Sequence, residues 1–334
     1  MFDEDRRPSM LSGQESASES SGRVKQISVK KEDVMGEIRF DGRVAVVTGA
    51  GGGLGKTYAT EFAKRGAKVV VNDFGGARDG TGGGTSMADT VVQEIKDAGG
   101  EAVANYDGVH TKEGGANIIK QAVDAFGKVD ILINNAGILR DKSFTKMTDD
   151  LWDPVMAVHL TGVYYVTFPA WPIMRENKFG RIIMTTSGTG LFGNFGQTNY
   201  GAAKLGQIGF MNSLGLEGAK YNVTVNAIAP IAASRLTEDI MPPDMLDKLR
   251  PDFVTPVVLY LCSEECTVSR RILSAGAGLV QRAAMLINKG AFLGKEPATP
   301  EAVRDQWAKI DSLEDVMEYQ NVMDGTMEAL KHYG

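Results

Sequence analysis

Six short runs of apolar, largely β-branched residues alternate with helical stretches between Asp41 and Cys266. The runs are RVAVVTG (43–49), AKVVVND (67–73), EAVANYD (101–107), VDILINNAG (129–137), GRIIMTTS (180–187) and VTVNAIAP (223–230). Each is apolar nearly throughout, as strands covered on both faces must be. The segments between them are long enough for crossover helices. The pattern therefore predicts an α/β fold, a Rossmann-type doubly wound parallel sheet that forms a single domain.

The segments on either side differ in composition. Residues 1–36 are rich in Ser, Glu, Gln and Lys and poor in large apolar side chains, so we expect a disordered N-terminal extension. Residues 37–266 hold the alternating pattern and form the expected catalytic domain. Residues 267–334 contain no further run of this kind and are expected to be a mainly helical extension. A helix start is predicted there, with Thr299 at the N-cap and Pro300 at the first position.

Two prolines lie in the segment 151–178, where a helix is expected to cover the sheet. Proline in an interior turn removes one backbone hydrogen bond and clashes with the preceding turn. Pro169 and Pro172 therefore predict a broken helix.

Charge and composition exclude several classes of protein. The net charge of −6 argues against nucleic-acid binding, which usually requires a basic face. No run of eighteen apolar residues and no apolar signal segment is present, so we expect no membrane span and no export. Cys262 and Cys266 lie one helical turn apart without a partnering His, and we expect reduced thiols and no metal. Since the final KHYG is not a peroxisomal Ser-Lys-Leu signal, the expected location is cytoplasmic.

A glycine-rich turn follows the first run and precedes a helix. In VTGAGGGLGKTYA, Gly49, Gly53 and Gly55 fit a TGxxxGxG spacing, with Leu54 between the last two. Glycines lack Cβ, so the backbone can turn tightly and approach a pyrophosphate at the positive end of the next helix. Flexible loops are glycine-rich too, but the strand before and the helix after indicate a dinucleotide site.

An acidic residue ends the second run. The carboxylate of Asp73 at this position would accept hydrogen bonds from the adenosine ribose hydroxyls and repel a 2′-phosphate, which favours NAD over NADP. The alternative is an aspartate that caps a helix or stabilises a turn. Lys56 and Arg78 are nearby cations that would admit NADP, so the preference stays open.

Two further strand ends belong to the expected cofactor site. Asp107 could accept a hydrogen bond from the adenine amino group, or it could be an ordinary turn residue. Asn135, Ala136 and Gly137 end the fourth run with small side chains, which lets a cofactor ribose lie against the backbone. Ligands of open α/β sheets bind at the carboxyl ends of strands. NAD is therefore the expected cofactor.

Tyr200 and Lys204 stand four residues apart in QTNYGAAKLG and share one face of a predicted helix. A protonated lysine beside the phenol favours the phenolate and would lower the tyrosine pKa from about 10 toward neutral. The phenolate could then take the proton of an alcohol while its carbon gives hydride to NAD⁺. Ser187, at the end of the fifth run, can hydrogen-bond the same substrate oxygen. A surface pair of no function is the alternative, and Ser187 argues against it.

These motifs together resemble the short-chain dehydrogenase/reductase family over residues 41–266. Longer stretches are similar to the (3R)-hydroxyacyl-CoA dehydrogenase unit of peroxisomal multifunctional enzymes of type 2, among them NNAGILRDKSF and GRIIMTTSGTGLFGNFGQTNYGAAKLG. The resemblance implies a homodimer that oxidises (3R)-3-hydroxyacyl-CoA to 3-ketoacyl-CoA with NAD⁺. The catalytic Ser, Tyr and Lys of the family fall on Ser187, Tyr200 and Lys204.

Two positions depart from the broad family. His159, in VHLTG, stands where the family has a catalytic asparagine; a neutral imidazole can also relay protons, or it can simply pack in the helix. Ile231 replaces the glycine of a Pro-Gly pair after the sixth run. By resemblance, Pro230 lies by the nicotinamide and Thr237 binds its carboxamide or a phosphate.

The substrate pocket is less well defined by the sequence. Family geometry would line it with residues 138–144, 188–196 and 234–249. Leu191, Phe192 and Phe195 are either an apolar wall or packing residues. Cations available for CoA phosphates follow: Arg140, Lys142, Arg235, Arg270 and Arg271.

Three functions remain possible from the sequence. The first is NAD-dependent oxidation of a (3R)-3-hydroxyacyl-CoA. The second is the same chemistry on another secondary alcohol or ketone, such as a steroid or an aromatic CoA thioester. The third is a non-catalytic dehydrogenase-fold subunit, which would have no need of the complete Ser, Tyr and Lys set. The C-terminal extension either packs on its own subunit or, as the resemblance implies, forms the dimer.

Overall fold

The computed structural model describes residues 36–232 and 243–333, and for residues 243–245 it describes the backbone alone. Residues from Ile38 onward form one compact unit. The predicted disorder concerns the N-terminal extension of residues 1–36, of which residues 1–35 lie outside this description. No helix in the described ranges is long and apolar enough to cross a membrane.

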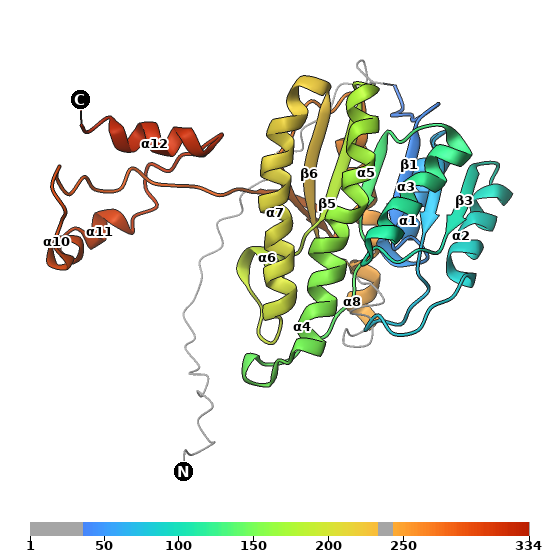
Figure 1. Cartoon of the computed structure of the whole chain (residues 1–334), viewed down its shortest axis with the longest axis horizontal. Helices are drawn as coiled ribbons and strands as arrows, with labels where there is room; N and C mark the ends of the chain where they lie inside the picture. Colours follow the sequence, from blue (N-terminus) through green and yellow to red (C-terminus); the bar gives the residue numbers. More distant parts are fainter. Residues whose placement is uncertain (1–35, 233–242, 334) are drawn as a thin grey trace, which may run out of the picture. The chain divides into compact units, whose positions relative to one another are not determined.

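An eight-stranded sheet forms the centre of this unit, with the order β3-β2-β1-β4-β5-β6-β7-β8 (Figure 1). Seven strands run parallel and β8 pairs antiparallel with β7. The strands are β1 (Val44–Thr48), β2 (Lys68–Asn72), β3 (Glu101–Asn105), β4 (Ile131–Asn134), β5 (Gly180–Thr185), β6 (Val223–Pro230), β7 (Ile272–Gly276) and β8 (Leu279–Ala283). All six predicted strands are present, and the doubly wound Rossmann-type fold is confirmed.

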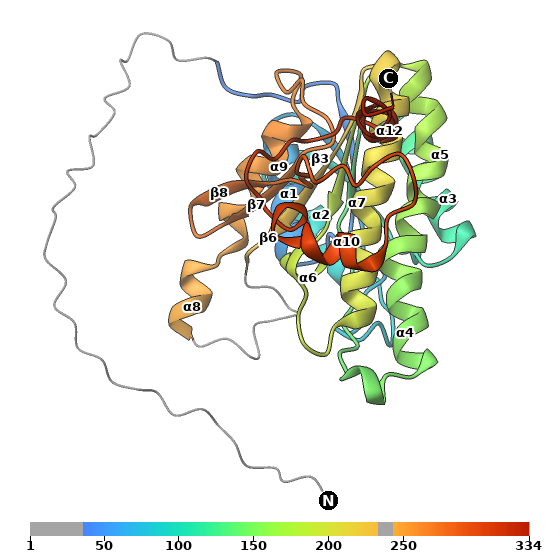
Figure 2. The ribbon, with the colours of Figure 1, turned by 90° about the vertical axis from the view of Figure 1, so that its left-hand side faces the viewer.

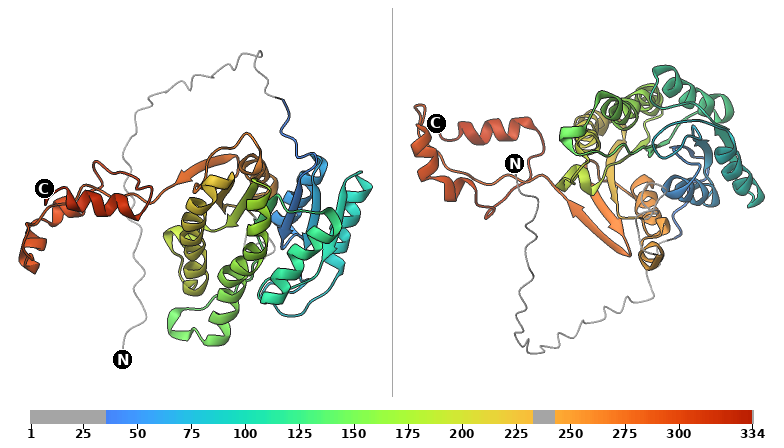
Figure 3. Two further views of the ribbon diagram at one scale, coloured as in Figure 1. Left: turned by 45° about the horizontal axis from the view of Figure 1, so that its top comes forward. Right: turned by 90° about the horizontal axis from the view of Figure 1, so that it is seen from below.

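Helices cover both faces of the sheet (Figure 3). One face packs against α1 (Gly53–Lys64), α2 (Ser86–Asp97) and α9 (Thr255–Cys262), and the other against α3 (Lys112–Phe126), α5 (Gly162–Glu176) and α7 (Thr198–Gly218). The remaining helical segments are η1 (Phe144–Lys146), α4 (Asp149–Met156), η2 (Ala157–Thr161), α6 (Gly188–Phe192), η3 (Ala219–Tyr221), α8 (Pro243–Lys248), η5 (Pro251–Phe253), α10 (Pro300–Asp305), α11 (Trp307–Ile310) and α12 (Val322–Leu330).

The continuous apolar character of the strands follows from this double cover. In β1, Ala45 and Val47 belong to the core on the side of α1, whereas Val44 and Val46 belong to the core on the side of α3. All four side chains are at most 1% exposed. Because successive strand residues point to opposite faces, a strand buried on both sides needs an apolar residue at every position.

The sheet extends beyond the predicted domain boundary at residue 266. Strands β7 and β8 occupy residues 272–283, so the prediction of a mainly helical extension from residue 267 is wrong for this part. The residues of β8 are mostly exposed, which removes the apolar signal of a doubly covered strand. The later residues do form short helices, and Thr299 caps α10 as predicted, its side chain accepting a hydrogen bond from the backbone N–H of Ala302.

The predicted break at Pro169 and Pro172 is also wrong. Helix α5 runs through both prolines, and α4, η2 and α5 form one helical run over residues 149–176 (Figure 2). The irregular turn lies earlier, as a π-helical turn at Ala157–Thr161. Burial of one apolar face of α5 against the sheet holds the helix, and this packing outweighs the roughly 3 kcal/mol local cost of a proline.

A buried carboxylate ties the amino ends of two strands together. Asp130, whose side chain is 1% exposed, accepts a hydrogen bond from the backbone N–H of Val44 at 2.8 Å. Its carboxylate also pairs with Arg43 at 3.1 Å and Lys128 at 2.9 Å. The Arg43 guanidinium lies over the Phe179 ring, 3.6 Å from its centroid. This cluster therefore fixes the edge of the sheet opposite to the carboxyl ends.

Replacing Asp130 with alanine leaves the buried Val44 N–H and the Lys128 ammonium without this acceptor, while Arg43 keeps its pair with Glu264. We expect Asp130→Ala to lower the free energy of unfolding by about 3 kcal/mol in urea denaturation followed by circular dichroism. The matched control is Asp124→Ala, since Asp124 pairs with Lys120 on an exposed helix surface. A control change of about 0.5 kcal/mol is expected. A loss below about 1 kcal/mol for Asp130→Ala would contradict the structural role assigned to this cluster.

Candidate active site

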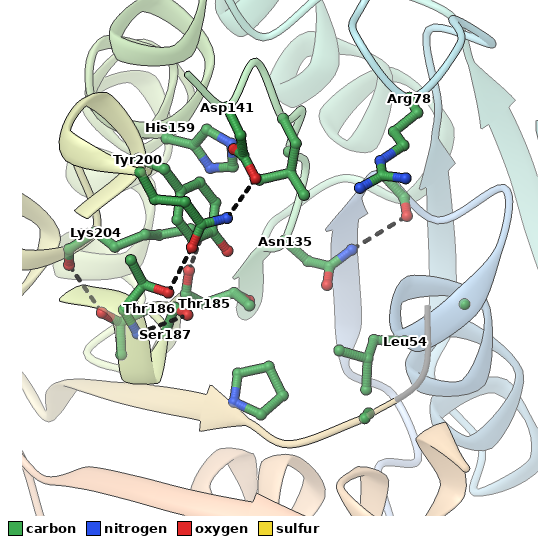
Figure 4. A pocket seen from close by; sticks show the side chains of 18 of the residues that line it. Leu54, Arg78, Asn135, Asp141, His159, Thr185, Thr186, Ser187, Tyr200 and Lys204 are labelled. Atoms are coloured by element: carbon green, nitrogen blue, oxygen red, sulfur yellow. Dashed lines mark hydrogen bonds between the residues drawn. The ribbon is translucent and has the colours of Figure 1, made fainter. Parts of the chain in front are cut away.

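A cavity of about 380 Å³ opens at the carboxyl ends of β1, β4, β5 and β6. Figure 4 shows Tyr200, Lys204 and Ser187 on one side of it and Leu54, Arg78 and Asn135 on the other. The cavity joins most of the predicted catalytic and cofactor-binding residues. Its predicted members are Gly49, Gly53, Leu54, Asp73, Asn135, Gly137, His159, Ser187, Tyr200, Lys204 and Pro230.

The glycine turn lies between β1 and the first turn of α1. Gly49 and Gly53 have φ of +63° and +51°, which favour glycine. Gly55 is required for a different reason, because a Cβ there would lie 2.2 Å from the Gly49 carbonyl oxygen. The turn is thus packed as tightly as a phosphate-binding turn needs to be, with the amino end of α1 facing the cavity.

Asp73 holds this turn from the end of β2. One of its carboxylate oxygens accepts a hydrogen bond from the Gly51 N–H and the other from the Gly75 N–H, both at 2.8 Å. Its side chain is 6% exposed and lines the cavity. Each carboxylate oxygen has a second lone pair, so Asp73 can still accept from ribose hydroxyls. Asp73 therefore stabilises the turn and also remains able to accept hydrogen bonds from a ribose, so its position is compatible with both roles considered above.

A second, smaller cavity of about 90 Å³ adjoins the first. Asp73, Asp107 and Ala136 line it, together with Phe74 and His110, whose rings meet edge to face. The carboxylate of Asp107 accepts hydrogen bonds from the side-chain amides of Asn105 at 2.8 Å and Asn117 at 3.1 Å. This arrangement places an oriented acceptor and two rings around a small cavity, which is compatible with an adenine.

Thr48 links the NNAG segment to the glycine turn. Its hydroxyl accepts hydrogen bonds from the backbone N–H groups of Asn135 at 3.0 Å and Ala136 at 3.1 Å. The Asn135 amide in turn donates to the carbonyls of Thr48 and Gly49. Gly137 has no room for a side chain, since a Cβ there would lie 2.5 Å from Cε1 of His159. Asn135 thus joins the NNAG segment to the glycine turn, a role that the sequence did not predict.

Ser187, Tyr200 and Lys204 meet on the other side of the cavity. Ser187 follows β5 and caps α6, its hydroxyl accepting a hydrogen bond from the Thr189 N–H. Tyr200 and Lys204 lie in the first two turns of α7, and Ser187 is hydrogen-bonded to the Tyr200 hydroxyl. Gly190 allows α6 to approach α7, because a Cβ there would lie 2.8 Å from the Lys204 Cβ. The predicted triad is therefore assembled within one cavity.

The electrostatics of the triad differ from the sequence prediction. Burial raises the pKa of Tyr200 to about 12, opposed by the hydrogen bond with Ser187 and reinforced by the charge of Asp141. Burial also lowers the pKa of Lys204 to about 7. The Lys204 ammonium donates to the backbone carbonyl of Thr185 and lies 5.4 Å from the centroid of the Tyr200 ring. The expected lowering of the tyrosine pKa is thus absent from the protein alone, because desolvation of the phenolate dominates.

His159 lies in the π-helical turn and is 1% exposed. Its Nε2 lies 2.7 Å from the Ile138 carbonyl oxygen and 3.0 Å from the Ile138 nitrogen, and its ring meets Tyr200 edge to face. Burial and the charge of Lys204 hold its pKa well below the usual range, so the imidazole is neutral. Its Nδ1 is buried without a hydrogen-bond partner in the protein. The structure therefore provides a neutral ring with one available nitrogen beside the tyrosine.

Gln207 supports this turn from α7, one turn beyond Lys204. Its amide donates a 2.6 Å hydrogen bond to the His159 carbonyl, and its Oε1 is buried without a partner. The sequence analysis did not identify Gln207, although its spacing of three residues from Lys204 puts it on the same helix face.

Some predicted residues lie elsewhere. Thr237 and Arg235 fall outside the described residues. Phe192 and Phe195 are exposed, and Leu191 is half-buried against the core. Arg270 donates to Gln320 in the C-terminal extension, and Arg271 pairs with Glu318 there. Cys262 and Cys266 are buried free thiols, and among the described residues no group of His, Cys, Asp or Glu could hold a metal.

Known proteins are similar to this chain in sequence and fold. A model of the short chain dehydrogenase family matches residues 43–240. The chain belongs to this family. It is an oxidoreductase that acts on CH–OH groups. A short-chain type dehydrogenase/reductase of Mycobacterium tuberculosis is 59% identical over 81% of this chain and 94% of its own length.

Multifunctional enzymes are similar over part of their length. The peroxisomal multifunctional enzyme A of Dictyostelium discoideum is 53% identical over 83% of this chain, which spans 62% of that protein. The solved structure of full-length peroxisomal multifunctional enzyme type 2 from Drosophila melanogaster matches with a TM-score of 0.75 and 41% identity, covering 88% of this chain and 50% of that one. These matches confirm the predicted resemblance.

A third structure bears on the cofactor. A 7α-hydroxysteroid dehydrogenase in complex with NADH and 7-oxo glycochenodeoxycholic acid matches with a TM-score of 0.65 and 29% identity, covering 72% of this chain and 95% of that one. Together with the family assignment, this supports a nicotinamide cofactor for the present chain.

The tightness of the glycine turn leads to a prediction. A methyl group on Gly55 must displace the Gly49 carbonyl, so we expect Gly55→Ala to weaken NADH binding at least about tenfold, measured by titration calorimetry. The control is Gly209→Ala in α7, where a Cβ meets nothing within 4 Å. This control should bind NADH as the wild type does. Unchanged affinity in Gly55→Ala would show that the turn adapts freely.

The raised pKa of Tyr200 can be tested in the protein without cofactor. A phenol whose pKa lies above its usual value stays protonated as the pH rises through the range where exposed tyrosines ionise. We therefore expect the ultraviolet titration of tyrosinate in the wild type to equal that of Tyr200→Phe up to about pH 10. A difference of one tyrosinate between about pH 7 and 9 would instead support the lowered pKa that the sequence predicts.

Proposed function

We propose that this chain catalyses the reversible, NAD-dependent oxidation of (3R)-3-hydroxyacyl-CoA to 3-ketoacyl-CoA. The observation that carries the proposal is the meeting of Ser187, Tyr200 and Lys204 in one cavity with the glycine turn. The likeness to multifunctional enzymes of type 2 along most of the chain supports the choice of substrate.

Tyr200 is the proposed general acid and base. Its hydroxyl takes the proton of the alcohol in the oxidation and returns it to the ketone in the reduction. Ser187, already hydrogen-bonded to Tyr200, holds the same substrate oxygen. A bound nicotinamide supplies the hydride acceptor. Lys204, whose Nζ lies 5.4 Å from the centroid of the Tyr200 ring, favours the phenolate when it is protonated.

His159 and Gln207 are proposed to support the proton transfer. The neutral imidazole of His159 contacts the ring of Tyr200 and keeps Nδ1 available for a proton donor or a water. Gln207 fixes the carbonyl of the same residue. His159 thus takes the place of the asparagine of the broad family without loss of a polar connection.

NAD rather than NADP is the proposed cofactor. Asp73 would receive the adenosine ribose, and its negative charge would repel a 2′-phosphate. Gly49, Gly53, Leu54 and Gly55 would form the pyrophosphate turn. Asp107 would orient the adenine, Asn135, Ala136 and Gly137 would lie against a ribose, and Pro230 would lie by the nicotinamide. Thr237 keeps its role as a prediction, and the proposed catalytic domain includes β7 and β8 beyond residue 266.

A homodimer, a CoA thioester substrate and a cytoplasmic location complete the proposal. Large apolar side chains of the C-terminal extension are exposed, including Leu313, Val322 and Met327, which supports burial against a second copy. Several relatives carry peroxisomal names, and the cytoplasmic location stays a prediction.

The proposed reaction is tested by reduced-nicotinamide absorbance with purified protein and (3R)-3-hydroxybutyryl-CoA. We expect turnover with NAD⁺, at least about tenfold less with NADP⁺ and none with the (3S) form. Tyr200→Phe should bind NADH and lose at least about a hundredfold in kcat, because general acid–base catalysis contributes this much. Tyr164→Phe, an exposed tyrosine on α5, is the matched control with unchanged kcat.

Other outcomes point to the alternatives. Turnover confined to another secondary alcohol would keep the catalytic roles and reject the CoA substrate. A folded protein that binds no NADH would support the non-catalytic subunit.

A further inference from the structure

Asp141 is a carboxylate at the substrate side of the cavity that the proposed reaction does not use. It follows the NNAG segment and lines the cavity with Tyr200, His159 and Lys204. Figure 4 shows Asp141 beside His159 and Tyr200, across the cavity from Arg78. Its charge acts on the Tyr200 hydroxyl, whose pKa it helps to raise. The negative charge of Asp141 thus acts on the Tyr200 hydroxyl, the proposed proton-transfer group.

Hydrogen bonds hold Asp141 and its neighbour Gln197 in fixed orientations. The Gln197 side-chain N–H donates to Asp141 at 2.7 Å. The Gln197 oxygen accepts from the hydroxyl of Thr189 and from the amide of Asn194, both at 2.9 Å. The amide group of Gln197 is therefore turned toward Asp141, and Asp141 uses one of the N–H donors that could otherwise bind an anionic substrate group.

Two described cations near this side are engaged by backbone carbonyls, whereas Arg78 lines the opposite side of the cavity. Lys204 donates to the Thr185 carbonyl, and burial lowers its pKa to about 7. The Arg140 guanidinium donates to the carbonyls of Asp79 at 2.8 Å and Asp150 at 2.7 Å. Asp150 lies four residues before Pro154, so proline has removed the helical donor for that carbonyl and Arg140 replaces it. Arg140 is thereby held outside the cavity lining.

We propose that Asp141 is a specificity-determining residue that rejects substrates with a free carboxylate beside the reacting carbon and admits neutral derivatives such as thioesters. A free 3-hydroxy or 3-keto acid carries its charge two bonds from the reacting carbon, within reach of Asp141. A thioester is neutral at this position, and the phosphates of CoA are separated from it by the whole pantetheine arm. The inference deepens the proposed function and rests on its assignment of the substrate side of the cavity.

Ketone reduction with NADH tests the inference on matched substrates. Acetoacetate is the anionic ketone, and ethyl acetoacetate and acetoacetyl-CoA are the derivatives neutral at this position. We compare kcat/KM for acetoacetate with kcat/KM for ethyl acetoacetate in the wild type, Asp141→Asn and Asp150→Asn. The first variant removes the charge and keeps an acceptor for Gln197. The second removes an equal charge from α4, outside the cavity lining.

We expect the wild type to favour the ester and Asp141→Asn to raise the acetoacetate-to-ester ratio at least about tenfold, since like charges at close range in a partly hydrated site repel by this order. Asp150→Asn should leave the ratio within about twofold. Asp141→Ser also removes the charge, with a smaller polar side chain, and should raise the acetoacetate-to-ester ratio in the same way. Agreement between the two variants would show that the change does not come from a local distortion caused by asparagine.

A ratio unchanged in Asp141→Asn, or a wild type that reduces acetoacetate as well as the ester, would overturn the inference. Failure of the wild type to reduce ethyl acetoacetate would also overturn it. Failure of the proposed function gives a different result. Ethyl acetoacetate is reduced and the acetoacetate-to-ester ratio rises in Asp141→Asn as expected, but acetoacetyl-CoA is not reduced. The two ideas can therefore fail separately.

Discussion

The burial of a parallel sheet on both faces is the constraint on which the rest of this protein depends. The side chains of the central strands are buried in two cores, one on each face of the sheet. Polar groups that contact a ligand must therefore lie where the strands end. The carboxyl ends of β1, β4, β5 and β6 meet along one edge, and this edge carries the cavity. The amino ends are closed instead by the buried ion cluster around Asp130.

The cavity is held by short polar links between these strand ends. The hydroxyl of Thr48 joins β1 to the NNAG segment, Asp73 joins β2 to the glycine turn, and Gln207 joins α7 to the turn that carries His159. Each link satisfies backbone groups that the turns leave without partners. Residues that the sequence predicts to bind the cofactor thus also stabilise the turns. Substitution of Asn135 or Asp73 is therefore expected to affect both cofactor binding and the local fold.

The sequence was sufficient for the parts governed by local pattern. Runs that are apolar nearly throughout predicted the six strands, and the Tyr200–Lys204 spacing predicted a shared helix face. It failed where tertiary packing decides. Strand β8 is exposed and lacks the apolar pattern, whereas α5 keeps two prolines because its buried face packs against the sheet. The pKa of Tyr200 depends on burial, which a spacing of four residues does not reveal. Asp141 falls in the range 138–144 expected to line the substrate pocket, but its own part in the site, like that of Gln207, became visible only through its hydrogen-bond partners.

The π-helical turn at Ala157–Thr161 has a consequence for how this site tolerates change in length. A π-turn holds one residue more than an α-turn, so it advances the phase of everything that follows by roughly 100°. The two halves of the run 149–176 therefore present differently phased faces, one to α7 beneath the cavity and one to the sheet. Deleting a single residue from this turn would restore a regular helix and rotate one half out of register. The length of this turn is therefore a constraint separate from the identity of its side chains, and the extra residue acts as a spacer that lets one helix pack against two surfaces.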